Sequence, residues 1–149
     1  MIFLLDLITI MCIGLLIGTE FAVSAFINPV LRKLDDRAQA SAIQLFAGRL
    51  GFVMLFWYGA SLLLLLLEMG IRFHQSGVLL LGSASGIWIA VIVLTLLFLV
   101  PINNRMTRIN PGEFDGASQR EHQRWDLLHR FRVAALSTAM VLFLAGIYR

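Results

Sequence analysis

The chain has 149 residues, of which 59% are hydrophobic and only 14% are charged, and its net charge is +3. Its mean hydropathy is +0.85, whereas soluble domains are about 45–50% apolar and about 25% charged. A soluble globule is therefore excluded, and so is a disordered chain, which would be poor in apolar residues. Nucleic-acid binding is not expected, because the arginines stand beside apolar segments. An integral membrane protein of one domain remains.

Four apolar segments are long enough to cross a bilayer, which takes about 20 residues in a helix. They cover residues 2–27, 50–68, 78–100 and 130–148. The first is expected to end at Asn28-Pro29 and the third at Pro101, because proline lacks an N–H donor and restricts the residue before it. We therefore predict an all-α fold, in which residues 1–149 form a single four-helix transmembrane bundle.

The two longer connections also carry helical signals. Before the second span, Asp35 or Asp36 can cap a helix that continues into the span, with apolar residues at helical spacing behind it. Before the fourth span, Ser118 and Glu121 form a capping box that is expected to open a cytoplasmic extension of the helix. Residues 68–76 are expected to form a short polar turn.

The basic residues are divided unequally between the two sides of this bundle. With four spans, both termini and the middle connection share one side, which holds only Arg72 and Arg149. The other ten Lys and Arg residues lie in or beside the two longer connections. Since cytoplasmic loops are enriched in Lys and Arg, we expect an inner bacterial membrane protein with both termini outside the cytoplasm.

Polar side chains at helical spacing mark the start of the fourth span. Trp125, His129 and Arg132 fall within roughly 60° of one another on a helix, and His122 joins them one turn earlier. Histidine can move protons, arginine can hold an oxyanion, and tryptophan offers a flat apolar wall. This face suits a reactive site, but Trp and Arg are also common as anchors at the membrane boundary.

Two further polar residues are candidates for a site. Glu20 lies inside the first span, where an ionisable residue indicates a function or an ion pair between helices. Arg49, Arg132 and His129 are its candidate partners. Asn103 follows the third span, where it could cap the helix end or bind a polar ligand group.

Small residues recur four apart on two of the spans. Gly14, Gly18 and Ala22 share a face of the first helix, and Gly82 and Gly86 share a face of the third. Such spacing lets membrane helices approach closely. We therefore expect helix contacts at these faces.

A metal or haem site is not expected. His74 should lie on the opposite side of the membrane from the other histidines. His122 and His129 are about 10 Å apart along one helix, which is too far for one ion without other ligands. The single cysteine, Cys12, excludes an internal disulfide and a multi-cysteine site.

Three short motifs, one at the end of the first span, one after the third and one at the start of the fourth, indicate a family. They are Asn28-Pro29-Val30-Leu31, Pro101-x-Asn103 and Trp125-x3-His129-x2-Arg132. With them the chain resembles the DUF1772, or anthrone oxygenase-like, family over nearly its whole length. The resemblance implies a relation to fungal membrane proteins that oxidise anthrones to anthraquinones without flavin or metal.

The resemblance also implies roles for the candidate residues. His129 would be a base that removes a proton beside a ketone, and the resulting enolate would pass an electron to dioxygen. Arg132 and Asn103 would stabilise the enolate oxygen, Trp125 would stack on the aromatic substrate, and Glu20 would orient His129 or Arg132. His129 and Arg132 are thus the expected catalytic residues, with Trp125, Asn103 and Glu20 binding substrate and no cofactor or metal.

A non-enzymatic function stays open beside this one. The same cluster could bind a lipid headgroup, a quinone or a partner subunit. The expected partners are membrane lipids, a small hydrophobic aromatic substrate and dioxygen, and a homo-oligomer is left open. Convergence of His129, Arg132, Asn103 and Glu20 on one apolar pocket would favour small-molecule chemistry.

Overall fold

The computed structural model describes residues 2–110, 112 and 114–149, and in this part of the chain every regular element is helical. The helices are α1 (Ile2–Ala22), α2 (Asn28–Leu31), α3 (Asp36–Ile71), α4 (Val78–Leu94), α5 (Val100–Met106) and α6 (Gly116–Ile147). They form four rods, α1 with α2, α3, α4 with α5, and α6, each long and apolar enough to cross a membrane. The predicted four-helix membrane bundle is confirmed.

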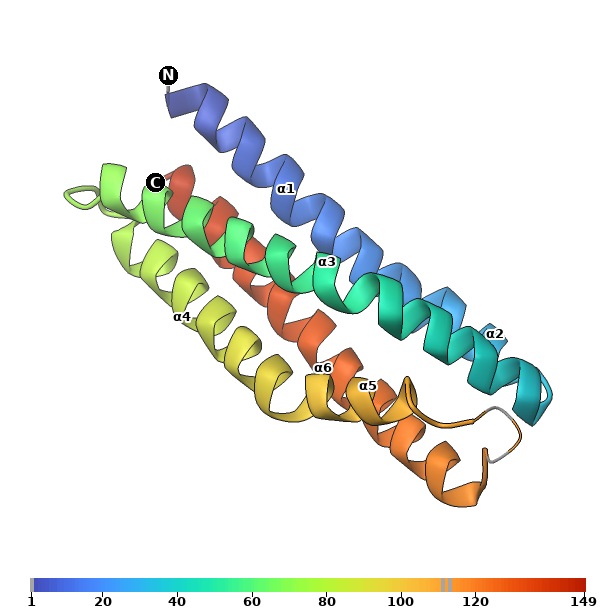
Figure 1. Ribbon diagram of the computed structural model, residues 1–149. Helices are drawn as coiled ribbons and strands as arrows, with labels where there is room; N and C mark the ends of the chain where they lie inside the picture. Colours follow the sequence, from blue (N-terminus) through green and yellow to red (C-terminus); the bar gives the residue numbers. More distant parts are fainter. Residues whose placement is uncertain (1, 111, 113) are drawn as a thin grey trace.

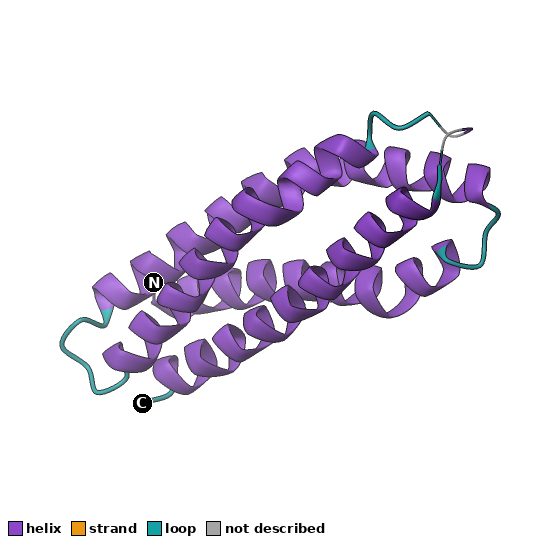
Figure 2. Ribbon diagram, turned by 90° about the horizontal axis from the view of Figure 1, so that it is seen from below, coloured by secondary structure: helices purple, strands orange, loops and turns teal. Residues whose placement is uncertain are grey.

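The four rods lie side by side along their length (Figures 1 and 2). α1 and α4 each pack against both α3 and α6, and the contact between α4 and α6 is the most extensive. Both termini and the connection 72–77 lie at one end of the bundle, which we call the terminal end (Figure 1). Residues 32–35, 107–110 and 114–115 lie at the other end, which we call the loop end.

Two prolines that were expected to end spans lie inside continuous rods. Pro29 and Pro101 stand in the first turn of α2 and α5, so the helical rods extend to Leu31 and Met106. The expected ends at residues 27 and 100 are therefore wrong, because proline is well tolerated in the first turn of a helix.

A π-helical turn precedes each of these prolines, at Val23–Ile27 and at Thr95–Leu99. In each turn the residue before the proline donates its N–H to the carbonyl five residues earlier, from Asn28 to Val23 and from Val100 to Thr95. Each turn holds one residue more than an α-helical turn. The helix can thus continue past a residue that has no N–H to donate.

α3 contains both the second span and the helical connection that was predicted before it. The Asp35 side chain caps it, accepting a hydrogen bond of 3.0 Å from the N–H of Ala38. The polar turn expected from residue 68 is wrong, because α3 continues to Ile71 and Glu68 is fully buried.

Glu68 is tolerated in this buried position because its charge has partners at the terminal end. Its carboxylate accepts a hydrogen bond of 3.1 Å from the Thr9 hydroxyl and is paired with Arg72. Arg72 also forms an ion pair with Asp6, so that α1 and the end of α3 are tied together. The sequence does not reveal this network, because its members come from α1 and from the end of α3.

The predicted small-residue contacts are present only in part. A Cβ at Gly82 would lie 3.7 Å from Sδ of Met69 on α3, which is an ordinary packing distance. A Cβ at Gly14, Gly18 or Gly86 would meet no atom of a described residue within 4 Å beyond the helix itself. The close approach occurs elsewhere, where a Cβ at Gly77 would overlap the backbone carbonyl of Gly146. The face that α1 turns inward carries Thr9, Ile13, Leu16 and Glu20 instead.

Buried apolar side chains pack in two separate clusters. The larger cluster fills the half toward the terminal end and consists of Ile13, Leu16, Tyr58, Leu65, Leu81, Ala84, Trp88, Val91, Leu136, Ala139 and Phe143. The smaller cluster lies toward the loop end and consists of Leu31, Ala40, Ile43, Ile102, Met106 and Phe114. The pocket that is described below lies between these two clusters.

α6 begins one turn earlier than the expected capping box, because Asp115 caps it rather than Ser118. Its carboxylate accepts hydrogen bonds of 2.9 Å from the N–H of Ser118 and 3.1 Å from that of Ala117. These bonds, above all that from Ser118, hold the pKa of Asp115 below its ordinary value. The capping interaction is therefore present above the ordinary pKa and is lost as the pH falls through the lowered one.

We predict that acidification frees the start of α6. Hydrogen exchange at the Ala117 and Ser118 amides, corrected for the intrinsic rate, should accelerate as the pH falls through the pKa of Asp115. In Asp115→Asn, which caps without titrating, this additional pH dependence should disappear. The same pH dependence in both proteins would contradict the role of Asp115.

Candidate functional site

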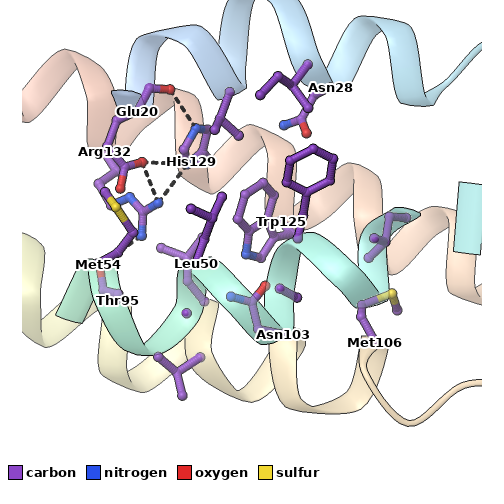
Figure 3. Close-up of a pocket in the computed structure, with 18 of the residues that line it drawn as sticks. Glu20, Asn28, Leu50, Met54, Thr95, Asn103, Met106, Trp125, His129 and Arg132 are labelled. Atoms are coloured by element: carbon purple, nitrogen blue, oxygen red, sulfur yellow. Dashed lines mark hydrogen bonds and ion pairs between the residues drawn. The ribbon is translucent and has the colours of Figure 1, made fainter. Parts of the chain in front are cut away.

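A pocket lies between the two apolar clusters and is lined by all four rods (Figure 3). It encloses a cavity of about 90 Å³, and about 880 Å³ of empty space when its open mouth is included. Most of its wall is apolar, with Ile27, Leu50, Met54 and Leu99 among the lining residues. The five residues predicted from the sequence all line it, namely Glu20, Asn103, Trp125, His129 and Arg132.

Glu20, His129 and Arg132 form a buried polar unit at what we call the inner end of the pocket, beside the larger apolar cluster (Figure 3). Nη2 of Arg132 donates to Oε2 of Glu20 at 2.6 Å and to Nδ1 of His129 at 2.8 Å. Nε2 of His129 lies 3.0 Å from the backbone carbonyl oxygen of Glu20. Because that oxygen can only accept, Nε2 carries the proton and Nδ1 is the acceptor.

Two hydroxyl groups from other helices complete the unit. The Tyr58 hydroxyl donates to Oε1 of Glu20 at 2.8 Å, and its ring lies 5.6 Å from the guanidinium carbon of Arg132, a cation–π distance. Nη1 of Arg132 donates to Oγ1 of Thr95 at 3.4 Å. Tyr58 and Thr95 could not be selected from the sequence, because each is an isolated polar residue in an apolar span and no spacing relates them to Glu20.

Both π-helical turns border the pocket. Val23 and Ile27 from the first, and Thr95 and Leu99 from the second, line its wall. A π-helical turn changes the direction in which the following side chains point, and such turns are frequent at functional sites. Pro29 and Pro101 therefore affect the shape of the pocket through the π-helical turns that precede them.

Trp125 lies between two histidines along α6. Its ring lies 4.7 Å from that of His129 and 6.1 Å from that of His122, with interplanar angles of 11° and 7°. The imidazole of His129 therefore stacks closely on the indole, whereas that of His122 is parallel to it but farther away. The N–H at the edge of the indole has no hydrogen-bond partner among the described residues, and the expected stacking of a substrate on the ring stays a prediction.

Asn103 lies at the other, outer end of the pocket from Arg132. Thr95, which contacts Arg132, is eight residues earlier on the same rod, or about 12 Å away along it. Asn103 lines the pocket together with Trp125. The expected joint action of Arg132 and Asn103 on one oxygen atom therefore does not match the geometry.

Asp126 supports the outer end, although the sequence analysis did not select it. Its buried carboxylate accepts a hydrogen bond of 2.8 Å from Asn28, which lines the pocket. It also forms ion pairs with Arg32 at 3.0 Å and with Arg130 at 3.2 Å. These contacts join α2 to α6, so Asp126 has a structural role beside the pocket.

The polar groups of the pocket differ in kind from a cluster of metal ligands. Among the residues that the structure describes, no three His, Cys, Asp or Glu side chains are grouped so that they could hold a metal. The polar groups that line the inner end are an acid–guanidinium pair, an imidazole and two hydroxyls, in apolar surroundings. This set can exchange a proton with a bound molecule and hold an oxygen that becomes negatively charged.

Fold and site together define an integral membrane protein with a pocket lined by all four of its helical rods. The model of one family, described as anthrone oxygenase, matches residues 42–142, which is most of the chain. The chain therefore belongs to the anthrone oxygenase family. No curated protein and no solved structure matches it significantly. The matched segment contains Tyr58, Asn103, Trp125, His129 and Arg132, whereas Glu20 lies before it.

We predict that removing one partner of the Glu20–Arg132 pair destabilises the protein more than replacing both partners by apolar residues. Glu20→Ala leaves a buried guanidinium without its carboxylate and should lower the free energy of unfolding by about 3–5 kcal/mol. The double variant Glu20→Leu, Arg132→Met removes both charges and should recover most of this loss. Unfolding in detergent measures both.

The exposed pair of Arg105 and Glu121 provides the control for this comparison. Arg105→Ala should change the free energy of unfolding by less than about 1 kcal/mol, because water screens such a pair. A double variant less stable than Glu20→Ala would contradict the prediction.

Proposed function

We propose that the protein is an oxygenase that oxidises an activated aromatic ketone of the anthrone class with dioxygen, using its own side chains and no cofactor. The observation that carries this proposal is the unit of Glu20, His129 and Arg132, which closes the inner end of an apolar pocket. Membership of the anthrone oxygenase family supports the choice of substrate.

The first step is removal of a proton from the carbon that the ketone activates, with Nδ1 of His129 as the base. Its lone pair becomes free for this step when Nη2 of Arg132 turns from Nδ1 to the ketone oxygen of the substrate. This nitrogen lies 3.1 Å from Oε2 of Glu20, and Nε2 lies 3.0 Å from the backbone oxygen of the same residue. An imidazolium would thus have an acceptor at each nitrogen, both supplied by Glu20. We assign His129 as catalytic and Glu20 as the residue that positions it.

Arg132 stabilises the negative charge that then develops on the ketone oxygen. Protonated Nδ1 no longer accepts from Arg132, so that Nη2 loses one of its two partners. Nε of Arg132 is buried without a partner among the described residues, and Nη1 has only the long bond to Thr95. These donors are available to an enolate oxygen and remain held by the pair with Glu20.

The enolate is electron-rich enough to reduce dioxygen by one electron. The two radicals combine to a peroxide, which takes the proton from His129 and then loses water to leave a second ketone. The substrate loses two hydrogen atoms and gains one oxygen atom, and the other oxygen atom of dioxygen leaves in water. An apolar pocket admits dioxygen and keeps bulk water from the enolate.

Oxygen consumption with anthrone by the protein in detergent tests this function. His129→Ala should lower kcat by about 10²- to 10⁴-fold, the usual contribution of a general base. His74→Ala is the control, since His74 lies at the terminal end away from the pocket and should leave the rate unchanged.

Equal turnover in both variants and in the unaltered protein would contradict the catalytic role of His129. Absence of turnover in the unaltered protein, above the rate in detergent alone, would contradict the oxygenase function for this substrate. Binding of anthrone without turnover would favour the non-enzymatic alternative.

We also propose that the loop end lies in the cytoplasm of a bacterium, and that both termini lie outside it. Ten of the twelve Lys and Arg residues belong to the loop-end side, and such residues are retained in the cytoplasm. Alkaline phosphatase fused after Arg149 should therefore be active, because it would lie outside the cytoplasm. Green fluorescent protein fused at the same position should not fluoresce, because it would be exported unfolded by the Sec route. The reverse pair of results would overturn the orientation.

A further inference from the structure

Three buried side-chain nitrogens have no hydrogen-bond partner among the described residues. They are Nε2 of His122, Nε1 of Trp125 and Nε of Arg132. All three residues lie on α6 and line the same pocket. Buried polar groups nearly always have a partner, so the place to look for the missing partners is a molecule inside the pocket.

The chemistry of two of these nitrogens defines what they would contact. Nε of Arg132 and Nε1 of Trp125 each carry a proton and can only donate. The ligand atoms that face them are therefore acceptors. Arg132 and Trp125 are seven residues apart, or about 10 Å along α6, so the two acceptors belong to opposite ends of the ligand.

The outer end of the pocket is equipped for a neutral oxygen atom. Trp125 and His122, each with a nitrogen that lacks a partner among the described residues, line the pocket there together with Asn103. Arg132, at the inner end, is the only Lys or Arg among the described residues that line the pocket. A carboxylate at the outer end would have no cation facing it, whereas a ketone, ether or phenol oxygen needs none.

We propose that the substrate is a fused aromatic ketone with a second, neutral oxygen acceptor at the end remote from the reacting ketone. The N–H of Trp125 binds this oxygen, with His122 and Asn103 beside it. Trp125 is thus a specificity residue that acts through its edge. This inference rests on the proposed function for the identity of the reacting end, but it is tested by binding alone.

Two product-like compounds of nearly equal shape provide the test, 2-methoxyanthraquinone and 2-ethylanthraquinone. Only the methoxy compound has an acceptor in its substituent. Isothermal titration in detergent should show the unaltered protein binding it about five-fold more tightly, the ratio that one neutral hydrogen bond gives. In Trp125→Phe, which keeps a flat ring but has no N–H, the ratio should fall to about one.

The ethyl compound reports whether the variant pocket is intact, and its affinity for Trp125→Phe should stay within about two-fold of the original. Trp57→Phe is the matched control and should keep the five-fold ratio, because the Trp57 N–H donates to the Cys12 carbonyl and does not line the pocket. It also reports on the effect of a Trp→Phe change as such.

Equal affinity of the two compounds for the unaltered protein would overturn the proposal, and would mean that water suffices for these donors. The proposal would also be overturned if Trp125→Phe kept the preference for the methoxy compound, or if neither compound bound to the unaltered protein. A protein that shows the preference but consumes no oxygen would support this inference and reject the oxygenase function, so the two failures are distinguishable.

Discussion

The ion pair between Glu20 and Arg132 is the interaction on which the rest of the structure depends. Either charge alone inside a membrane bundle would be very unfavourable, so α1 and α6 have to meet with these two groups in contact, as they do at 2.6 Å. The remaining oxygen of Glu20 binds Tyr58 of α3, and Arg132 reaches Thr95 on the rod of α4 and α5. One buried pair thus ties all four rods together at a single level.

The same pair creates the conditions for chemistry. Because the two charges neutralise each other, the pocket above them can remain apolar while it ends in a strong set of donors. The pair also holds the imidazole of His129 in one tautomer, with Nε2 donating to the Glu20 backbone and Nδ1 accepting from Arg132. A second network, of Asp6, Glu68 and Arg72, ties α1 to the end of α3 at the terminal end of the bundle.

The pocket has two ends with different character, and α6 supplies the polar groups of both. Toward the inner end Arg132 and His129 face Glu20, and toward the outer end Trp125 and His122 have nitrogens without partners among the described residues. The π-helical turns of the other rods shape the wall between these ends. A flat molecule with an oxygen at each end fits this distribution of donors, and the proposed oxidation would take place at the inner one.

The sequence by itself determined the four spans, the long helix before the second span and the stripe of Trp125, His129 and Arg132, because hydrophobicity and helical spacing are local properties. It also marked Glu20, since an acid in a span needs a partner. Only the tertiary structure decided that this partner is Arg132 rather than Arg49, and that Tyr58 and Thr95 join it, because those contacts cross between helices. It likewise decided that His129 stacks on the indole of Trp125 and that helices continue through Pro29 and Pro101, since stacking and π-helical hydrogen bonds depend on the positions of neighbouring backbone and rings.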